Sequence, residues 1–77
     1  MGGATAAGIH TVFRSATGNW ANQLASGEHV YGVYATKDEC VRRGQRLASD
    51  AGVNHVIHDV DGTVSSVTPY RSDPRPL

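Results

Sequence analysis

The chain has 77 residues, enough for one small domain, whose net stability we expect to be on the order of 3–5 kcal/mol. Seven basic and seven acidic side chains give a formal net charge of zero, which argues against a general polyanion-binding protein. The single Cys40 excludes an internal disulfide, and no signal peptide or membrane-spanning stretch is evident. We therefore expect a cytoplasmic protein that makes no membrane contact.

After a flexible N-terminus at residues 1–8, the first half of the chain predicts three short strands. Residues 9–15 and 29–35 are rich in β-branched and aromatic side chains, and larger and smaller residues alternate over 19–25. The segments between them contain Gly18 and Gly27 and suit tight turns. This pattern predicts an antiparallel meander.

A helix is the strongest prediction. Thr36 and Glu39 have the spacing of a capping box, and Gly52 suits a left-handed C-terminal position. Gly44 in the middle costs about 1 kcal/mol relative to alanine, so we expect it to allow a close approach of the helix to the sheet. The apolar or small residues at helical spacing are Cys40 or Val41, Gly44, Leu47, Ala48 and Ala51.

Two more strands follow the helix. Residues 53–60 predict a fourth strand, Asp61–Gly62 a hairpin turn, and residues 63–68 a fifth strand. The predicted order is βββαββ, an α+β fold with a five-stranded, mainly antiparallel sheet and one helix on one face. We expect this domain to span residues 9–70, with the spatial strand order 3-2-1-4-5, and a Pro-rich tail at 71–77.

Several short motifs also occur in order along the chain. They comprise Gly, Trp and Ala around the second strand, a Thr-x-x-Glu helix start, an arginine-containing helix, an apolar strand ending in His, an Asp-Gly turn, and a Tyr-x-x-Asp-Pro tail. The residues that carry them are Gly18, Trp20, Ala21, Thr36, Glu39, Arg42, Arg46, Leu47, Ala48, Ile57, His58, Asp61, Gly62, Tyr70, Asp73 and Pro74.

In this order and spacing, the chain resembles a small bacterial family catalogued as a domain of unknown function, family 2188. The resemblance supports the fold and implies no activity, because the family has no established biochemical role. The chain departs from the family pattern at Asn19, Cys40, His55 and Arg71.

Histidines and aspartates are concentrated in residues 55–64, which raises the question of a metal site. Side chains of a strand alternate between its two faces, so His55 and His58 should point to opposite sides. A hairpin explains the stretch more simply, and we predict no bound metal or cofactor. A cross-strand pair between one of these histidines and His10 or His29 remains open.

No catalytic motif is present in the sequence. Cys40 lies in the first helical turn, where the helix dipole would lower the pKa of a thiol, but it also lies on or beside the apolar stripe. A buried, inert thiol is the better interpretation. We therefore expect a protein that is not an enzyme.

One helix covers only one face of such a sheet, whereas the strands carry apolar residues on both faces. An open apolar sheet face indicates a partner, either a second copy of the chain in a homodimer or another protein. Alternatively, the C-terminal tail folds across that face. The residues predicted for this interaction surface are His58, Val56, Trp20 and Tyr31.

The helix also carries a basic cluster, formed by Arg42, Arg43 and Arg46 with Lys37 at its start. Such residues could contact nucleic-acid phosphates. Because acidic residues are interleaved and the net charge is zero, nucleic-acid binding is the second hypothesis, after the interaction module. A metal or pH response mediated by the histidines is the third.

Overall fold

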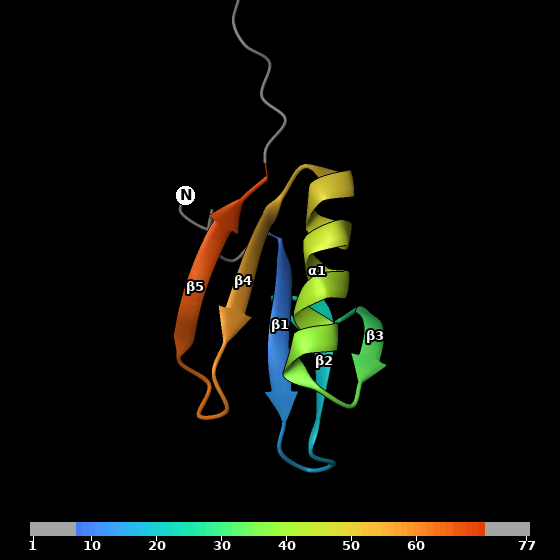
Figure 1. The fold of residues 1–77 in the computed structure, drawn as a ribbon, viewed down its shortest axis with the longest axis vertical. Helices are drawn as coiled ribbons and strands as arrows, with labels where there is room; N and C mark the ends of the chain where they lie inside the picture. Colours follow the sequence, from blue (N-terminus) through green and yellow to red (C-terminus); the bar gives the residue numbers. More distant parts are fainter. Residues whose placement is uncertain (1–7, 71–77) are drawn as a thin grey trace, which may run out of the picture.

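The computed structural model describes residues 8–70, which form five strands and one helix (Figure 1). The predicted order βββαββ and fold class are confirmed: a mixed, mostly antiparallel sheet with one helix. The expectations for residues 1–7 and for the tail at 71–77 lie outside the described residues. The elements are β1 (Ile9–Arg14), β2 (Asn19–Leu24), β3 (Val30–Tyr34), α1 (Lys37–Ala51), β4 (Asn54–His58) and β5 (Val64–Pro69).

The strands lie in the order β3-β2-β1-β4-β5, as the sequence predicted. β1 and β4 are parallel, and every other neighbouring pair is antiparallel. The parallel pair follows from the helix, which carries the chain back along the sheet between β3 and β4. As a result, Ile9 lies opposite His55 and His10 lies opposite Val56.

Both ends of α1 are fixed by the residues that the sequence indicated. The Thr36 hydroxyl accepts a hydrogen bond from the Glu39 amide at 3.2 Å, and Gly52 adopts a left-handed conformation with φ of 69°. The reciprocal half of the predicted capping box does not form, because the Glu39 carboxylate lies 3.7 Å from Arg43 instead. The helix therefore has a single side-chain cap at its N-terminus.

A buried polar cluster lies where α1 crosses the central strands. The Thr11 hydroxyl donates to Asn22 Oδ1 at 2.6 Å, which leaves its oxygen to accept from His55 Nε2 at 2.8 Å. Asn22 also donates to the backbone carbonyl of Cys40 in α1 at 2.9 Å. All three side chains are almost completely buried. The cluster therefore joins β1, β2 and β4 to the helix.

Gly44 lies directly over this cluster. A Cβ atom at this position would lie 2.6 Å from His55 Nε2 and 2.7 Å from Asn22 Oδ1. The predicted close approach of helix and sheet at Gly44 is thus confirmed. The buried stripe of the helix consists of Cys40, Gly44 and Ala48.

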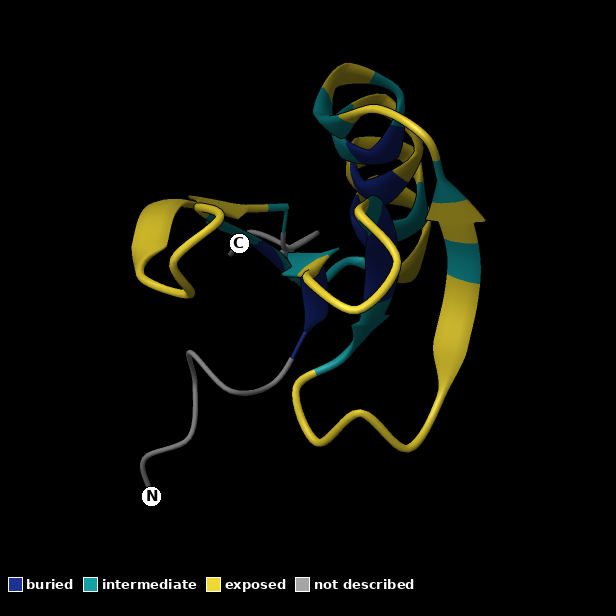
Figure 2. Cartoon of the chain, turned by 90° about the horizontal axis from the view of Figure 1, so that it is seen from below, coloured by how far each residue is buried: buried dark blue, intermediate teal, exposed yellow. Residues whose placement is uncertain are grey.

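The helix covers one face of the sheet unequally. α1 contacts β1, β2, β3 and β4 but makes no contact with β5, and it lies well to one side of that strand (Figure 1). Every residue of β5 is exposed. Buried residues gather where the helix meets the central strands, whereas the outer strands are mostly exposed (Figure 2).

We predict that Gly44→Ala destabilises the protein, although alanine is the better helix former. Overpacking against the polar cluster costs about 1–3 kcal/mol, while the better helix propensity of alanine offsets about 1 kcal/mol, so we expect a net loss of up to about 2 kcal/mol. Urea denaturation measures it. Ser49→Ala, at an exposed position of the same helix, is the matched control and should stay within about 0.5 kcal/mol of the wild type. A stabilised Gly44→Ala variant would contradict the close approach.

Candidate functional site

The loop between β4 and β5 is the hairpin that the sequence predicted, although it is longer than two residues. The Asp59 amide donates to the Thr63 carbonyl at 2.8 Å, and the Gly62 amide donates to the Asp59 carbonyl at 2.9 Å. Gly62 has φ of 91°, which favours glycine. Asp61 accepts hydrogen bonds from the Thr63 amide and hydroxyl, and these bonds lower the pKa of its carboxyl group. The aspartates of this stretch therefore shape the turn.

His58 forms a pair with His10 of the neighbouring parallel strand. His10 Nδ1 lies 2.9 Å from His58 Nε2, and the rings are stacked with an interplanar angle of 29°. His58 Nδ1 lies 3.1 Å from the Gly62 carbonyl, which can only accept, so this nitrogen carries the proton. In the neutral ring, His58 Nε2 is then the acceptor and His10 Nδ1 the donor.

His55 lies on the other face, as strand alternation predicted, and belongs to the polar cluster under Gly44. Its side chain is almost completely buried. Burial, together with the nearby His10, lowers the pKa of His55 below its usual value. Its ring is therefore a structural element of the core.

Cys40 is also buried within the described domain. Burial raises the pKa of its thiol to about 11, and the neighbouring Glu39 adds to this effect. A thiol that stays protonated at neutral pH is a poor nucleophile. The favourable helix-dipole position of Cys40 does not overcome the cost of burying a thiolate.

The four residues predicted to form one interaction surface are separated in the structure. Val56 is completely buried, and Trp20 is buried on the helix face, where it contacts Phe13. Tyr31 is exposed on the edge strand β3, and His58 is half-buried on the opposite face from Trp20. Strand alternation accounts for the division between faces. Val56 lies in β4, between β1 and β5, on the face opposite α1, and is nevertheless completely buried. Whether His58 or Tyr31 contacts a partner stays a prediction.

Exposed apolar side chains lie instead at the two outer strands, on the sheet face opposite α1, which we call the outer face. Residues paired across neighbouring strands point to the same face of the sheet. The exposed apolar residues are paired with Ala21, Gln23, Val56 and His58, and each of these alternates along its strand with residues that point toward the helix. Their exposed fractions lie between 41% and 52%. The four outer-face valines are Val30 and Val33 of β3 and Val64 and Val67 of β5.

Of the predicted nucleic-acid contacts, two are engaged within the protein. Lys37 lies 3.4 Å from the Asp59 carboxylate and 5.5 Å from the centre of the Trp20 ring. Arg43 is paired with Glu39. Among residues 8–70, Arg42 and Arg46 have no ion pair.

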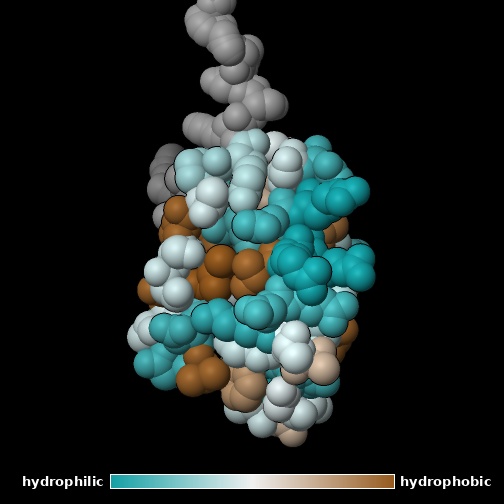
Figure 3. Space-filling model, viewed as in Figure 1, coloured by the Kyte–Doolittle hydropathy of each residue, from teal (hydrophilic) through white to brown (hydrophobic). Residues whose placement is uncertain are grey.

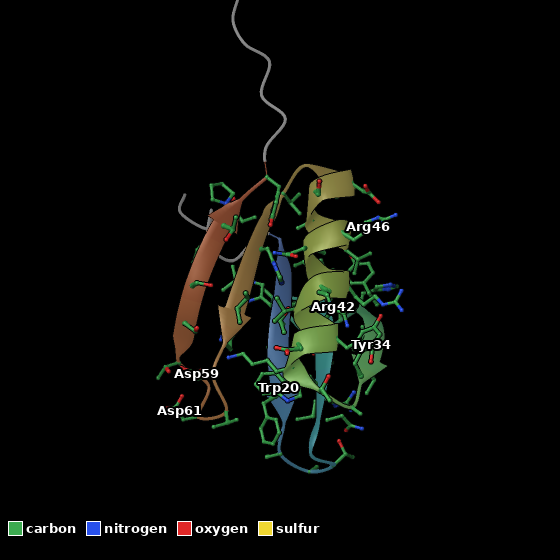
Figure 4. All side chains as sticks on the ribbon, in the orientation of Figure 1. Trp20, Tyr34, Arg42, Arg46, Asp59 and Asp61 are labelled. Atoms are coloured by element: carbon green, nitrogen blue, oxygen red, sulfur yellow. The ribbon has the colours of Figure 1, made fainter. Side chains whose placement is uncertain are left out.

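Arg42 and Arg46 line a shallow hollow together with Gln45, Ser49 and Tyr70. Both arginines project from α1, one turn apart (Figure 4). Hydrophilic side chains dominate this side of the molecule, and a hydrophobic patch lies beside the helix, toward β5 (Figure 3). The hollow therefore presents two cations, two neutral polar side chains and one aromatic ring.

Residues 9–70 match the sequence model of a known protein family. This family is described as an uncharacterized protein conserved in bacteria (DUF2188). The chain belongs to this family. The match confirms the resemblance inferred from the ordered motifs and covers every strand and the helix of this DUF2188 domain. No curated protein and no solved structure matches the chain.

The described part of this DUF2188 domain contains neither a cluster of metal ligands nor a membrane-spanning helix. No group of three or more His, Cys, Asp or Glu side chains within residues 8–70 could hold a metal ion. Over the same residues, no helix has both the length and the apolar character needed to cross a membrane.

The sequence indicated apolar side chains on both faces of the strands and left open a cross-strand pair of His58 with His10 or His29, but it did not single out the outer-face valines or His10. Their signals were present, because valine dominates the apolar positions of both outer strands and His10 lies in the strand adjacent to β4. The exact pairing depends on register, which hydrophobic periodicity leaves undefined.

The lowered pKa of His55 predicts a dependence of stability on pH. Below its usual pKa of about 6.5, the unfolded chain takes up a proton that the buried ring resists, so the free energy of unfolding should fall as the pH decreases from about 6.5 to about 5. Urea denaturation across this range measures the loss. Proton NMR of the His55 ring in the folded protein provides the site-specific check, and a titration midpoint above about 6.5 would contradict the assignment.

Proposed function

We propose that this protein is a non-enzymatic interaction module that forms a homodimer through the outer face and edges of its sheet. The observation that carries the proposal is the character of the two edge strands. Neither β3 nor β5 contains a charged residue, and each exposes two of the four outer-face valines. Natural edge strands are commonly protected by charged side chains, so two uncharged, valine-bearing edges favour contact with another chain.

A second copy of the chain is the occupant that the charges favour. The formal net charge of the chain is zero, so two copies do not repel each other through net charge. β5 receives no support from the helix, and its side chains are exposed on both faces. Antiparallel pairing of β5 with β5 of a second copy extends the sheet, buries Val64 and Val67, and has two-fold symmetry. A domain of this size buries little apolar surface on folding, so dimerisation would also add to its stability by burying more.

We predict that Val67→Lys disrupts the dimer, because it places a charge at the two-fold interface. Light scattering of the wild type over a concentration series should approach twice the chain mass, whereas the variant should remain monomeric. Val60→Lys is the matched control, since Val60 is 65% exposed in the β4–β5 loop and lies outside both edge strands. A wild type that stays monomeric throughout, or equal disruption by Val60→Lys, would refute the proposal. Circular dichroism verifies that each variant folds.

A second candidate function, single-stranded nucleic-acid binding, has a separate observation in its favour. Arg42 and Arg46 have no ion pair within residues 8–70 and share a hollow with Tyr70. Arginine contacts to phosphates, combined with an aromatic ring on which a base stacks, are typical of single-strand binding. Lys37 and Arg43, whose charges are paired, contribute less in this hypothesis.

The Arg42→Ala/Arg46→Ala double variant should weaken binding to a single-stranded oligonucleotide and flatten its salt dependence. Each lost phosphate contact changes the slope of log affinity against log salt by about 0.7. Fluorescence anisotropy at several salt concentrations measures both effects. Arg14→Ala removes an exposed arginine from the end of β1 and should leave the affinity nearly unchanged. Absence of binding by the wild type at low salt would exclude this function.

A further inference from the structure

The His10–His58 pair has the arrangement of two metal ligands in neighbouring coordination positions. We propose that it binds a divalent transition-metal ion, Cu²⁺ or Ni²⁺, between His10 Nδ1 and His58 Nε2. The two side chains come from β1 and β4, adjacent parallel strands of the central sheet, which fix their backbones relative to each other. The site lies on the same face as the proposed dimer contact, because His58 is the cross-strand partner of Val64, but both of its ligands come from one chain.

The distance between the two nitrogens, which a hydrogen bond sets in the metal-free protein, is also compatible with this kind of metal. They lie 2.9 Å apart. Imidazole nitrogens at about 2.0–2.1 Å from a metal are separated by about 2.9 Å when the angle at the metal is about 90°, and by about 3.3 Å when it is tetrahedral. Right-angled positions occur in square-planar and tetragonal sites, which Cu²⁺ and Ni²⁺ favour, whereas Zn²⁺ favours the tetrahedral angle.

The surroundings of His58 match those of a metal-ligating histidine. Such rings usually donate their second N–H group to a carbonyl or carboxylate, which fixes the tautomer and orients the ring. His58 Nδ1 has this partner in the Gly62 carbonyl, at 3.1 Å. The tight β4–β5 loop, closed by the hydrogen bonds of Asp59, holds that carbonyl in place. His58 Nε2 consequently presents a lone pair toward His10.

Metal binding replaces the proton shared by the two rings. His10 Nδ1 releases its proton to solvent while His10 Nε2 takes one up from solvent, so the ring stays neutral and no net proton is released, and both rings turn until their lone pairs converge on the ion. The contact between the rings is partly buried. Water fills the remaining coordination positions, because no third His, Cys, Asp or Glu ligand lies nearby within residues 8–70. The site is thus a two-histidine chelate with open positions.

Isothermal titration calorimetry of the untagged protein with Cu²⁺, Ni²⁺ and Zn²⁺ salts tests the proposal. We expect Cu²⁺ to bind more tightly than Ni²⁺, and both to bind more tightly than Zn²⁺. His58→Gln and His10→Gln should each lower the Cu²⁺ affinity by at least about tenfold, the loss seen even for second-shell partners. His29→Gln is the matched control, because His29 lies immediately before β3, makes an edge-to-face contact with Tyr31 and should not affect binding.

A second measurement locates the ion without any substitution. Cu²⁺ is paramagnetic, so amide NMR signals of residues next to His10, His58 and Gly62 should broaden first, while those around His29 persist. His10 is buried, and if its variant fails to fold, His58→Gln and this broadening pattern decide the question. Absence of Cu²⁺ binding, an equal loss in His29→Gln, tighter binding of Zn²⁺, or broadening centred elsewhere would each overturn the proposal.

Discussion

The structure depends on the close contact between Gly44 and the buried polar cluster of Thr11, Asn22 and His55. Burying polar side chains without hydrogen-bond partners costs free energy. Here Thr11 forms hydrogen bonds with both Asn22 and His55, so each of the three has a partner. Asn22 also donates a hydrogen bond to the backbone of α1. Only a residue without a Cβ leaves room for them beneath the helix. This contact fixes the position of α1 over β1, β2 and β4.

The position of the helix determines what the rest of the molecule exposes. Because His55 points toward the helix, strand alternation places His58 on the outer face. The register of the parallel β1–β4 pair then puts His58 next to His10. The helix does not reach β5, and among the described elements that strand contacts β4 alone. The outer strands therefore retain exposed valines, whereas α1 directs Arg42 and Arg46 away from the sheet. The exposure of these valines and arginines thus follows from the placement of one helix.

The predictable part of the candidate sites was the face on which each side chain lies. Strand alternation separated His55 from His58, and helical spacing grouped Arg42 with Arg46. Exposure was harder to predict, because the buried state of Val56 and Trp20 depends on how many neighbours surround each strand. The ion pairs also could not be predicted from the sequence. Lys37 contacts Asp59, 22 residues away, and this contact forms only because the β4–β5 loop lies beside the start of the helix in the folded protein.

The elements, their order, the ends of the helix at Thr36 and Gly52, and the need for a small residue at position 44 could all be predicted from the amino-acid sequence. These features follow from local backbone preferences and from periodicity, which act over a few residues. Three features became evident only from the folded arrangement. His55 joins a buried hydrogen-bonded cluster, and His10 contacts His58. Arg42 and Arg46 have no ion pair in the described domain. These outcomes depend on strand register and helix placement, which bring together residues that no local rule connects.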